Sequence, residues 1–345
     1  MLKTLPPQII QQKNAIETIW CLEPSNYQVI LAETLKYLDS KAISISQVLE
    51  ALGFYCTYNL MNLELAYNLC KDLHEQLHFS KVPAFIKSYS LRKLLDNDHI
   101  IEANSNSPIQ NEQIFAFRQN NLHFSQELSQ QDILNVYEYM SIEYSLLHDN
   151  ILKFKEFFQK NSPYTIDCFM YMIDSPHYTE LLLIDACAYY GASKCFHYLL
   201  ENGSLVSSET FNCAAIGGNP TILHTCESIP NITISNSAID LAIKAHHSTV
   251  ALWLEVKYKL RFSWNSVLET KDYRFLINKI KKIKDINSVD SKRTTLLNAA
   301  ESYNDTEILY WVVGASTKNP MNLKKKTQWV GKGNGSIHKK NNTRF

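Results

Sequence analysis

The sequence contains one pattern that is typical of a metal-dependent enzyme. His74, Glu75 and His78 form an H-E-x-x-H run in a segment whose apolar residues recur every three or four positions, as in an α-helix. On a helix, two such histidines lie on one face and can bind zinc, while the glutamate can act as general base on a bound water. The pattern therefore gives one candidate function, a zinc-dependent peptidase.

The residues around this run weaken the zinc hypothesis. Lys81 and Ala84 stand where the extended signature of the metzincin peptidases has glycine and histidine. A third ligand of the glutamate type would have to be Glu102, which lies in a polar stretch rather than on a predicted helix. His74 and His78 also fall at the edge of the apolar face of their helix. We therefore expect no metal and no catalytic residue, and keep the peptidase as the alternative.

Other reactive side chains have simple structural interpretations. The 8 cysteines include no C-x-x-C pair, and several fall at apolar positions of helical patterns, where cysteine acts as a small hydrophobe. Cys187, Cys195 and His197 could suggest a thiol nucleophile. However, Cys195 falls at a core position of the outer helix, and His197, close to it on the chain, points away from it. Gly217-Gly218 lacks the Lys-Ser/Thr of a phosphate-binding loop. We expect a non-enzymatic protein without a cofactor.

Composition favours a folded, all-α protein. The chain has 345 residues, of which 45% are hydrophobic and 11% aromatic, enough for about two ordinary domains. It contains only 9 glycines and 10 prolines, which suits helices joined by short turns better than a β-sandwich.

Charge is distributed unevenly along the chain. Residues 318–345 carry 8 basic and no acidic residues, which leaves 26 basic against 34 acidic residues in 1–317, a net charge of −8. We expect no nucleic-acid binding by this acidic body, and only nonspecific binding through the basic, disordered tail 318–345. A second alternative function is therefore a nuclear or anion-binding adaptor that works through the tail.

No segment looks like a membrane anchor or a signal peptide. The first twenty residues contain Pro6-Pro7 and a Gln/Lys stretch, and no run approaches eighteen apolar residues. We expect no membrane partner and a cytoplasmic location, or a nuclear one if the tail acts as an import signal.

Helical periodicity divides the chain into modules. Apolar residues recur at three and four positions from residue 27 to 95, so we expect an N-terminal helical module over 1–95. Residues 96–113 are polar and rich in turn formers, which predicts a linker. Ser129-x-x-Asp132 and Asn150 are helix-capping signals, and Ser162-Pro163 predicts a helix through Ile173.

The second half contains a faint internal repeat with a period near thirty residues. Small residues recur around a helix-ending position in four segments, which are 184–191, 211–218, 239–246 and 296–303. Gly191 supplies the left-handed conformation that ends a helix, whereas His246 and Tyr303 replace glycine and make that turn uncertain. The widest gap leaves room for a decayed unit around Trp264 and Phe275.

These segments resemble the ankyrin repeat. The run 294–300, Thr-Thr-Leu-Leu-Asn-Ala-Ala, is similar to its T-P-L-H-x-A-A signature. The phrases at 188–196, 217–222 and 238–247 resemble an uncharacterised, divergent ankyrin family that is expanded in parasitic protists of the trichomonad type. The resemblance implies that residues 114–317 form an α-solenoid of helical hairpins.

Solenoids of this kind are usually surfaces for protein partners. The main hypothesis is accordingly a protein–protein interaction scaffold. Aromatic and charged residues at exposed positions of the first helices are the candidate partner-binding residues. They are Tyr189, Tyr190, Lys244 and Glu301.

Overall fold

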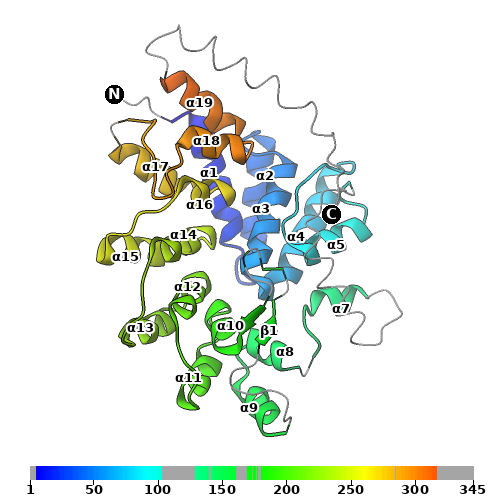
Figure 1. Cartoon of the computed structure of the whole chain (residues 1–345). Coiled ribbons are helices and arrows are strands. Elements are labelled where there is room, and N and C mark those ends of the chain that lie inside the picture. Colours follow the sequence, from blue (N-terminus) through cyan, green and yellow to red (C-terminus); the bar gives the residue numbers. More distant parts are fainter. Residues whose placement is uncertain are drawn as a thin grey trace, which may run out of the picture.

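The computed structural model describes residues 5–102, 129–139, 141–160, 169–172, 174–175, 177, 180–283 and 285–316. These residues are predominantly helical, as the composition predicts, with one short antiparallel pair of strands. None of their helices has the length and apolar character needed to cross a lipid bilayer. Figure 1 shows the N-terminal helices (blue) beside a series of helical hairpins (green to orange).

The N-terminal helices confirm the periodic pattern read between residues 27 and 95. They are α1 (Pro7–Trp20), α2 (Tyr27–Asp39), α3 (Ile45–Tyr58), α4 (Leu63–Leu77) and α5 (Tyr89–Asn97). α1 packs against α2 and α3, while α4 packs against α2, α3 and α5. Ser44 caps α3 in a reciprocal pair with Gln47, and Ser88 accepts a hydrogen bond from the N–H of Leu91 at the start of α5.

Short elements connect this module to the hairpins. They are α7 (Gln130–Leu134), α8 (Ile142–Leu147), α9 (Ile151–Lys160), β1 (Phe169–Tyr171) and β2 (Glu180–Leu182). The capping prediction at Ser129 is confirmed, because Ser129 and Asp132 bond reciprocally at the start of α7. The helix predicted after Ser162-Pro163 is wrong over 169–171, since these residues pair with β2 as a strand.

Residues 180–316 form a stack of helical hairpins, called here the hairpin stack (Figure 1). Its inner helices are α10 (Leu183–Tyr189), α12 (Ser208–Gly217), α14 (Asn236–Lys244), α16 (Trp264–Glu269) and α18 (Leu296–Ser302). Its outer helices are α11 (Ser193–Glu201), α13 (Pro220–Ser228), α15 (Ser248–Tyr258), α17 (Tyr273–Lys282) and α19 (Thr306–Ser316). Each inner helix contacts the next inner helix and its own outer helix. The unit expected around Trp264 and Phe275 is present as α16 and α17.

Two kinds of connection alternate along the stack and define two edges. The turn edge contains the turns within hairpins, around residues 189–192, 216–219, 244–247, 269–274 and 302–307. The loop edge contains the loops between hairpins and the last turn of each outer helix that leads into them. The loops lie around residues 202–207, 229–235, 259–263 and the described part of 283–295.

A left-handed residue ends the turn in every one of these five hairpins. Gly191 (φ 68°) and Gly218 (φ 67°) take this conformation without steric cost, whereas His246 (φ 57°) and Lys271 (φ 57°) adopt it with a side chain. The replacement of glycine by His246 thus leaves the turn intact. In the last hairpin Asn304 (φ 50°), and not Tyr303, takes the left-handed position.

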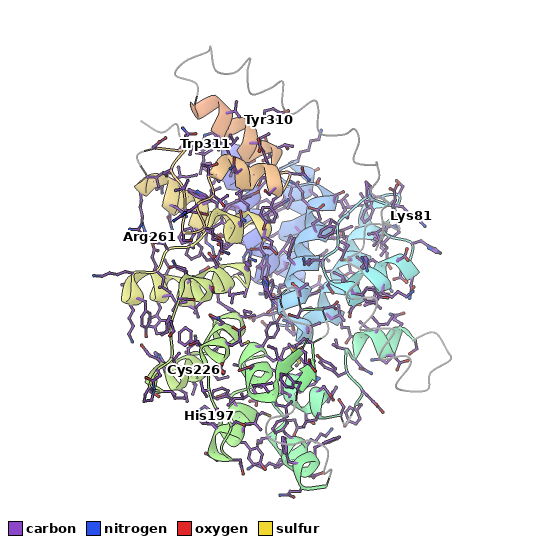
Figure 2. All side chains as sticks on the ribbon, viewed as in Figure 1. Lys81, His197, Cys226, Arg261, Tyr310 and Trp311 are labelled. Atoms are coloured by element: carbon purple, nitrogen blue, oxygen red, sulfur yellow. The ribbon has the colours of Figure 1, made fainter. Side chains whose placement is uncertain are left out.

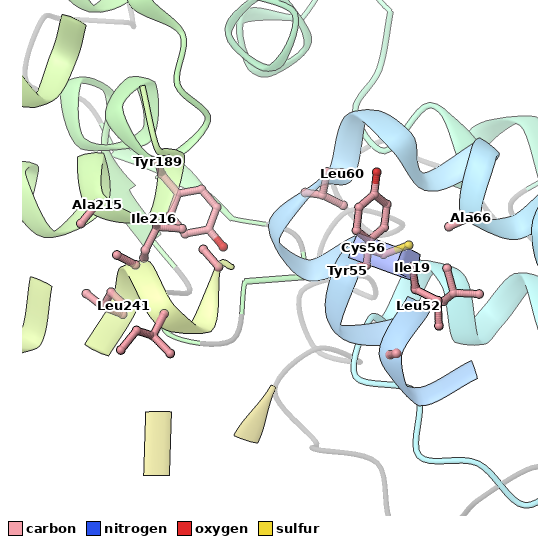
Figure 3. Packing of buried hydrophobic residues seen from close by; sticks show 14 of the residues in the cluster. Ile19, Leu52, Tyr55, Cys56, Leu60, Ala66, Tyr189, Ala215, Ile216 and Leu241 are labelled. Carbon is pink, nitrogen blue, oxygen red and sulfur yellow. The ribbon is translucent and has the colours of Figure 1, made fainter. Parts of the chain in front are cut away.

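One hydrophobic core extends from the N-terminal helices through the hairpin stack. Buried side chains from Ile9 in α1 to Val312 in α19 belong to the same cluster. Figure 3 shows two parts of it, around Tyr55 in α3 and around Ile216 in α12. The predicted linker begins too early, because Ile100 and Ile101 are buried in this core. Residues 103–113 of the linker, residues 114–128 and the basic tail 318–345 lie outside the described residues.

Candidate functional site: the two edges of the hairpin stack

The turn edge is covered by the chain's own N-terminal helices. The indole of Trp20, at the end of α1, stacks on the imidazole of His246, with ring centroids 3.7 Å apart and planes 6° from parallel. The Oη of Tyr189 donates a hydrogen bond to the carbonyl oxygen of Thr57 at 3.2 Å. Helix α1 also packs directly against α17. The edge where the hairpins turn is therefore an internal interface.

Charged groups cross the same interface. Arg274, in the first turn of α17, lies with its Nε 2.6 Å from Glu17 Oε1 and 3.3 Å from Asp272 Oδ1. Lys271 reaches toward Glu50 of α3, with a 3.7 Å separation. Near the end of the stack, Gln12 Nε2 donates to Glu307 Oε1 at 2.7 Å. These pairs fix α1 and α3 against the last two hairpins.

Burial changes the acid–base properties of this interface. Burial lowers the pKa of the His246 imidazole to about 3, although its Nε2 lies 3.1 Å from the carbonyl oxygen of Thr270. Burial also raises the pKa of the Asp272 carboxyl, while Arg274 lowers it in part. His246 is therefore neutral at physiological pH, and the ring that stacks on Trp20 carries no charge.

The segment between β1 and β2 is also connected to the N-terminal helices, at the start of α5. The buried carboxylate of Asp174 accepts hydrogen bonds from Ser88 Oγ at 3.0 Å and from the N–H of Tyr89 at 2.7 Å. It also accepts from the N–H of Ser90 at 3.1 Å. Asp174 therefore satisfies free N–H groups at the start of α5, so that a residue distant in sequence completes this helix N-terminus.

Three of the four candidate partner-binding residues are less accessible than the sequence predicts. Tyr189 is 3% exposed and points into the interface with the N-terminal helices, so its predicted exposure is wrong. Tyr190 is half-buried, and its Oη lies 2.9 Å from the Oη of Tyr137. Lys244 forms an ion pair with Glu269 at 2.7 Å and its side chain is 13% exposed. Only Glu301 is exposed.

The structure does not give the H-E-x-x-H run the geometry that zinc binding needs. Helix α4 ends at Leu77, and His78 is its C-cap in the left-handed conformation with φ 48°. His78 is therefore not on the helix face of His74, whose ring makes an edge contact with Phe79 instead. Glu102 is exposed and lies next to the bridge between Val82 and Ile101. Within the described part of the chain, no three His, Cys, Asp or Glu side chains are grouped to hold a metal.

The buried thiols have the inert character that the sequence predicts. Of the seven cysteines that the structure describes, all but Cys21 are buried. Burial raises the pKa of the Cys187 thiol well above its usual range and that of Cys226 to about 12. His197 bonds to its own helix and lies 3.3 Å from Thr225 Oγ1, which links α11 to α13. These groups hold the stack together.

The loop edge is built differently, from carboxylates that tie one hairpin to the next. Asp185 in α10 accepts a hydrogen bond from Thr210 Oγ1 of α12 at 2.5 Å. Asp240 in α14 accepts from the N–H of Ser263 at 2.7 Å, just before α16. Asp290 accepts from the N–H of Trp264 at 2.6 Å. Asp185 and Asp240 thus tie α10 and α14 to the next inner helix, and Asp290 ties the last loop to the start of α16.

The surface of the loop edge is open and carries apolar and basic side chains. Leu205 is 83% exposed, Val256 is 77% exposed and Val289 is 59% exposed. Arg261 marks this edge in Figure 2, where its side chain points outward. This surface could not be predicted from helical periodicity, because loop residues show none, and the net charge of −8 over residues 1–317 conceals a local excess of basic residues.

One open pocket of about 650 Å³ lies where α1, α2, the start of α3 and α19 meet. Its lining is mainly apolar and includes Leu35, Leu38 and Ile43, with Gln12 and Glu307 at one side. No histidine or cysteine lines it, so the pocket does not gather the reactive side chains that the sequence singles out.

The geometry thus separates a closed turn edge from an open loop edge. No protein-family model matches the chain, and no curated protein matches it either.

Proposed function

We propose that the protein is a non-enzymatic scaffold that binds a protein partner through the loop edge and the outer helices of the hairpin stack. The observation that carries this proposal is the contrast between the two edges. The chain's own helices cover the turn edge, whereas Leu205, Val256 and Val289 on the loop edge remain exposed. Exposed apolar side chains on one side of a fold are typical of protein-binding surfaces.

Helix α15 gives further support. Val250, Ala251 and Leu254 bury one face of it in the stack. On the opposite face Leu252 is 45% exposed and Val256, one turn later, is 77% exposed. A helix that is apolar all round is normally covered on both faces, so the outer face of α15 suits a partner.

We also propose that the hairpin stack is a divergent ankyrin-like solenoid. Paired helices, left-handed turns and side-by-side inner helices support this kinship, as does the T-P-L-H-like run that begins α18. Proteins of this architecture use an extended surface made by several units, so contacts should involve more than one hairpin.

Affinity purification of the full-length chain from its native cell tests the function. A variant in which three exposed loop-edge residues become serine should lose its specific partners; the changes are Leu205→Ser, Val256→Ser and Val289→Ser. A control variant changes three exposed apolar residues of the N-terminal module and should keep the partners; these changes are Val29→Ser, Met61→Ser and Phe85→Ser.

Both variants should unfold like the parent chain, because substitution of exposed residues shifts the free energy of unfolding by about 0.5 kcal/mol or less. Circular dichroism with thermal unfolding checks this condition. Retention of every partner by the loop-edge variant would remove the proposed surface, and loss of the same partners by the control variant would move the surface to the N-terminal module.

A further inference from the structure

A basic strip crosses the loop edge of an otherwise acidic protein. Between residues 257 and 293 the sequence has 11 basic and 4 acidic residues, a net charge of +7, whereas residues 1–317 as a whole carry −8. Seven basic side chains of this segment are exposed on the loop edge or on the ends of the outer helices that border it. They are Lys257, Lys259, Arg261, Lys281, Lys282, Lys292 and Arg293.

Neighbouring carboxylates neutralise only part of the strip. Lys257 pairs with Glu227 of α13, Lys282 pairs with Glu255 of α15 at 2.8 Å, and Lys292 pairs with Asp240 of α14 at 3.0 Å. These pairs also show that the ends of α13, α15 and α17 lie together. The remaining four basic side chains form no ion pair with a described residue. They are Lys259, Arg261, Lys281 and Arg293.

A half-buried cation, Lys279, lies beside the strip. Lys279 Nζ lies 4.0 Å from the ring centroid of Trp264 and 4.4 Å from that of Phe262, and it donates to the carbonyl oxygen of Phe262 at 2.6 Å. Its contacts are satisfied within the fold, so its role is structural. Its charge nevertheless adds to the positive potential that the exposed basic residues create.

Apolar side chains adjoin these charges. Leu252 and Val256 lie one helical turn apart on the outer face of α15, and Val256 is followed at once by Lys257 and then by Lys259. The Lys282–Glu255 ion pair brings the end of α17 to the same helix. A partner on this surface therefore meets an aliphatic row bordered by cations that form no ion pair with a described residue.

We infer that the basic strip binds an acidic amphipathic segment of a partner protein. Carboxylates of that segment would pair with Lys259, Arg261 and Lys281, while its apolar side chains would cover Leu252 and Val256. The inference deepens the proposed function and rests on it. The strip suits a peptide better than a nucleic acid, because its exposed apolar groups, Leu252 and Val256, are aliphatic. The half-buried rings of Trp253 and Tyr258 already lie under the Lys257 ammonium, so they are not free faces on which a base can stack.

The chain's own tail does not fit this surface. Residues 318–345 have 8 basic and no acidic side chains, so the strip repels them. The tail is therefore not the occupant of the strip.

Fluorescence anisotropy with a labelled peptide tests the inference on the full-length chain. The probe is a helical peptide of about 18 residues, with glutamates on one face and leucines on the other. Binding should weaken as salt rises, because exposed ion pairs are screened. Reversal of three unpaired charges, Lys259→Glu, Arg261→Glu and Lys281→Glu, should raise Kd at least about tenfold at low salt.

Matched variants separate the strip from general charge effects. Lys81→Glu, Lys93→Glu and Lys194→Glu reverse three exposed lysines elsewhere and should change Kd by less than about twofold. Neutralisation of the tail lysines Lys324, Lys325 and Lys326 to glutamine should also leave Kd within about twofold. Leu252→Ser with Val256→Ser should weaken the amphipathic probe but not a polyglutamate of equal charge.

Three outcomes would overturn the inference. One is equal loss of affinity in the strip and control variants, and another is unchanged affinity in the strip variant. The third is tighter binding of an oligothymidine of about 20 nucleotides than of the peptide, which would assign the strip to nucleic acid. If the peptide fails while the loop-edge serine variant still loses its cellular partners, the scaffold function stands and only the partner chemistry is wrong.

Discussion

The turn edge and the loop edge lie at opposite ends of the same inner helices, yet they differ in almost every physical property. The turn edge is covered by α1 and α3 and contains stacked rings and half-buried ion pairs, such as Trp20 with His246 and Glu17 with Arg274. The loop edge is held by single carboxylates and leaves aliphatic and basic groups in water. In this fold, a repeated hairpin therefore provides one edge for internal packing and one for external contact.

The difference also shows where side-chain volume is restricted. At the turn edge neighbouring hairpins approach backbone to backbone, and a Cβ built on Gly217 would lie 2.1 Å from the carbonyl oxygen of Ala188. At the loop edge a Cβ on Gly203 would meet no atom within 4 Å. The turn edge therefore constrains sequence through contact, and the loop edge hardly does.

Paired glycine substitutions give the largest expected contrast between the edges. Gly217→Ala should lower the free energy of unfolding by about 3 kcal/mol or more, because the backbones of two hairpins must move apart. Gly203→Ala should lower the free energy of unfolding by about 1 kcal/mol, since the only unfavourable change is an alanine in the left-handed conformation with φ 95°. Urea unfolding followed by circular dichroism measures both. Equal costs would show that the hairpins are not in close contact at the turn edge.

The pH dependence of the free energy of unfolding should reveal that the imidazole of His246 is buried at the turn edge. Its pKa is about 3 in the folded chain and about 6.5 in the unfolded chain, so only the unfolded chain binds a proton between these values. The contribution of His246 to the free energy of unfolding is therefore present above pH 6.5. It falls by about 3 kcal/mol as the pH drops from 7 to 4. His246→Asn keeps a residue that tolerates φ > 0 and should remove this component.

Unfolding free energies of the parent chain and the His246→Asn variant, measured from pH 7 to 4, test that prediction. Glu17, Asp272 and Arg274 face the imidazole or lie beside it and are present in both proteins, so the difference isolates His246. Parallel curves would mean that His246 is accessible to water and not held beneath Trp20.

At the loop edge the pH dependence should have the opposite sign and a smaller size. Burial raises the pKa of Asp185 to about 6, above the value of about 3.9 in an unfolded chain. Between these pKa values only the folded chain binds a proton at Asp185. The contribution of Asp185 to the free energy of unfolding is therefore present below pH 4, and it decreases by about 2 kcal/mol as the pH rises to 7. Asp185→Asn should remove this decrease.

The same unfolding series, applied to Asp185→Asn, measures the effect. Glu209 and Thr210 face this carboxyl and are unchanged in the variant. A variant that loses stability at pH 7 as much as at pH 4 would show that Asp185 is ionised and needed as an anion at the loop edge.

Local periodicity predicted much of the fold. Apolar spacing located the N-terminal helices and the unit at Trp264, and Gly191 and Ser129 marked a turn and a cap where the structure has them. These features depend on interactions between residues close in sequence, so a short window contains the information.

The covering of the turn edge could not be read in this way. Trp20 and His246 meet through the tertiary fold, and neither position carries a signal for the other. Tyr189 was predicted to be exposed for the same reason. Its position at the end of a short helix gives no sign that its hydroxyl bonds to Thr57 of α3. Asp174 likewise caps a helix far away in sequence. Because the N-terminal helices cover the turn edge, the candidate surface is the loop edge and not the inner helices that the sequence indicates.

The contact of Gln12 with Glu307, a separation of 295 residues, has a consequence for synthesis on the ribosome. At about 5 to 20 residues per second, helix α1 waits roughly 15 to 60 seconds before α19 emerges. During that interval the apolar side chains Ile9, Ile16 and Ile19 have only part of their final surroundings, and α17 is also missing. The nascent chain therefore exposes the face of α1 that later closes the turn edge, and it does so for longer than a chain whose first helices pack only on their neighbours.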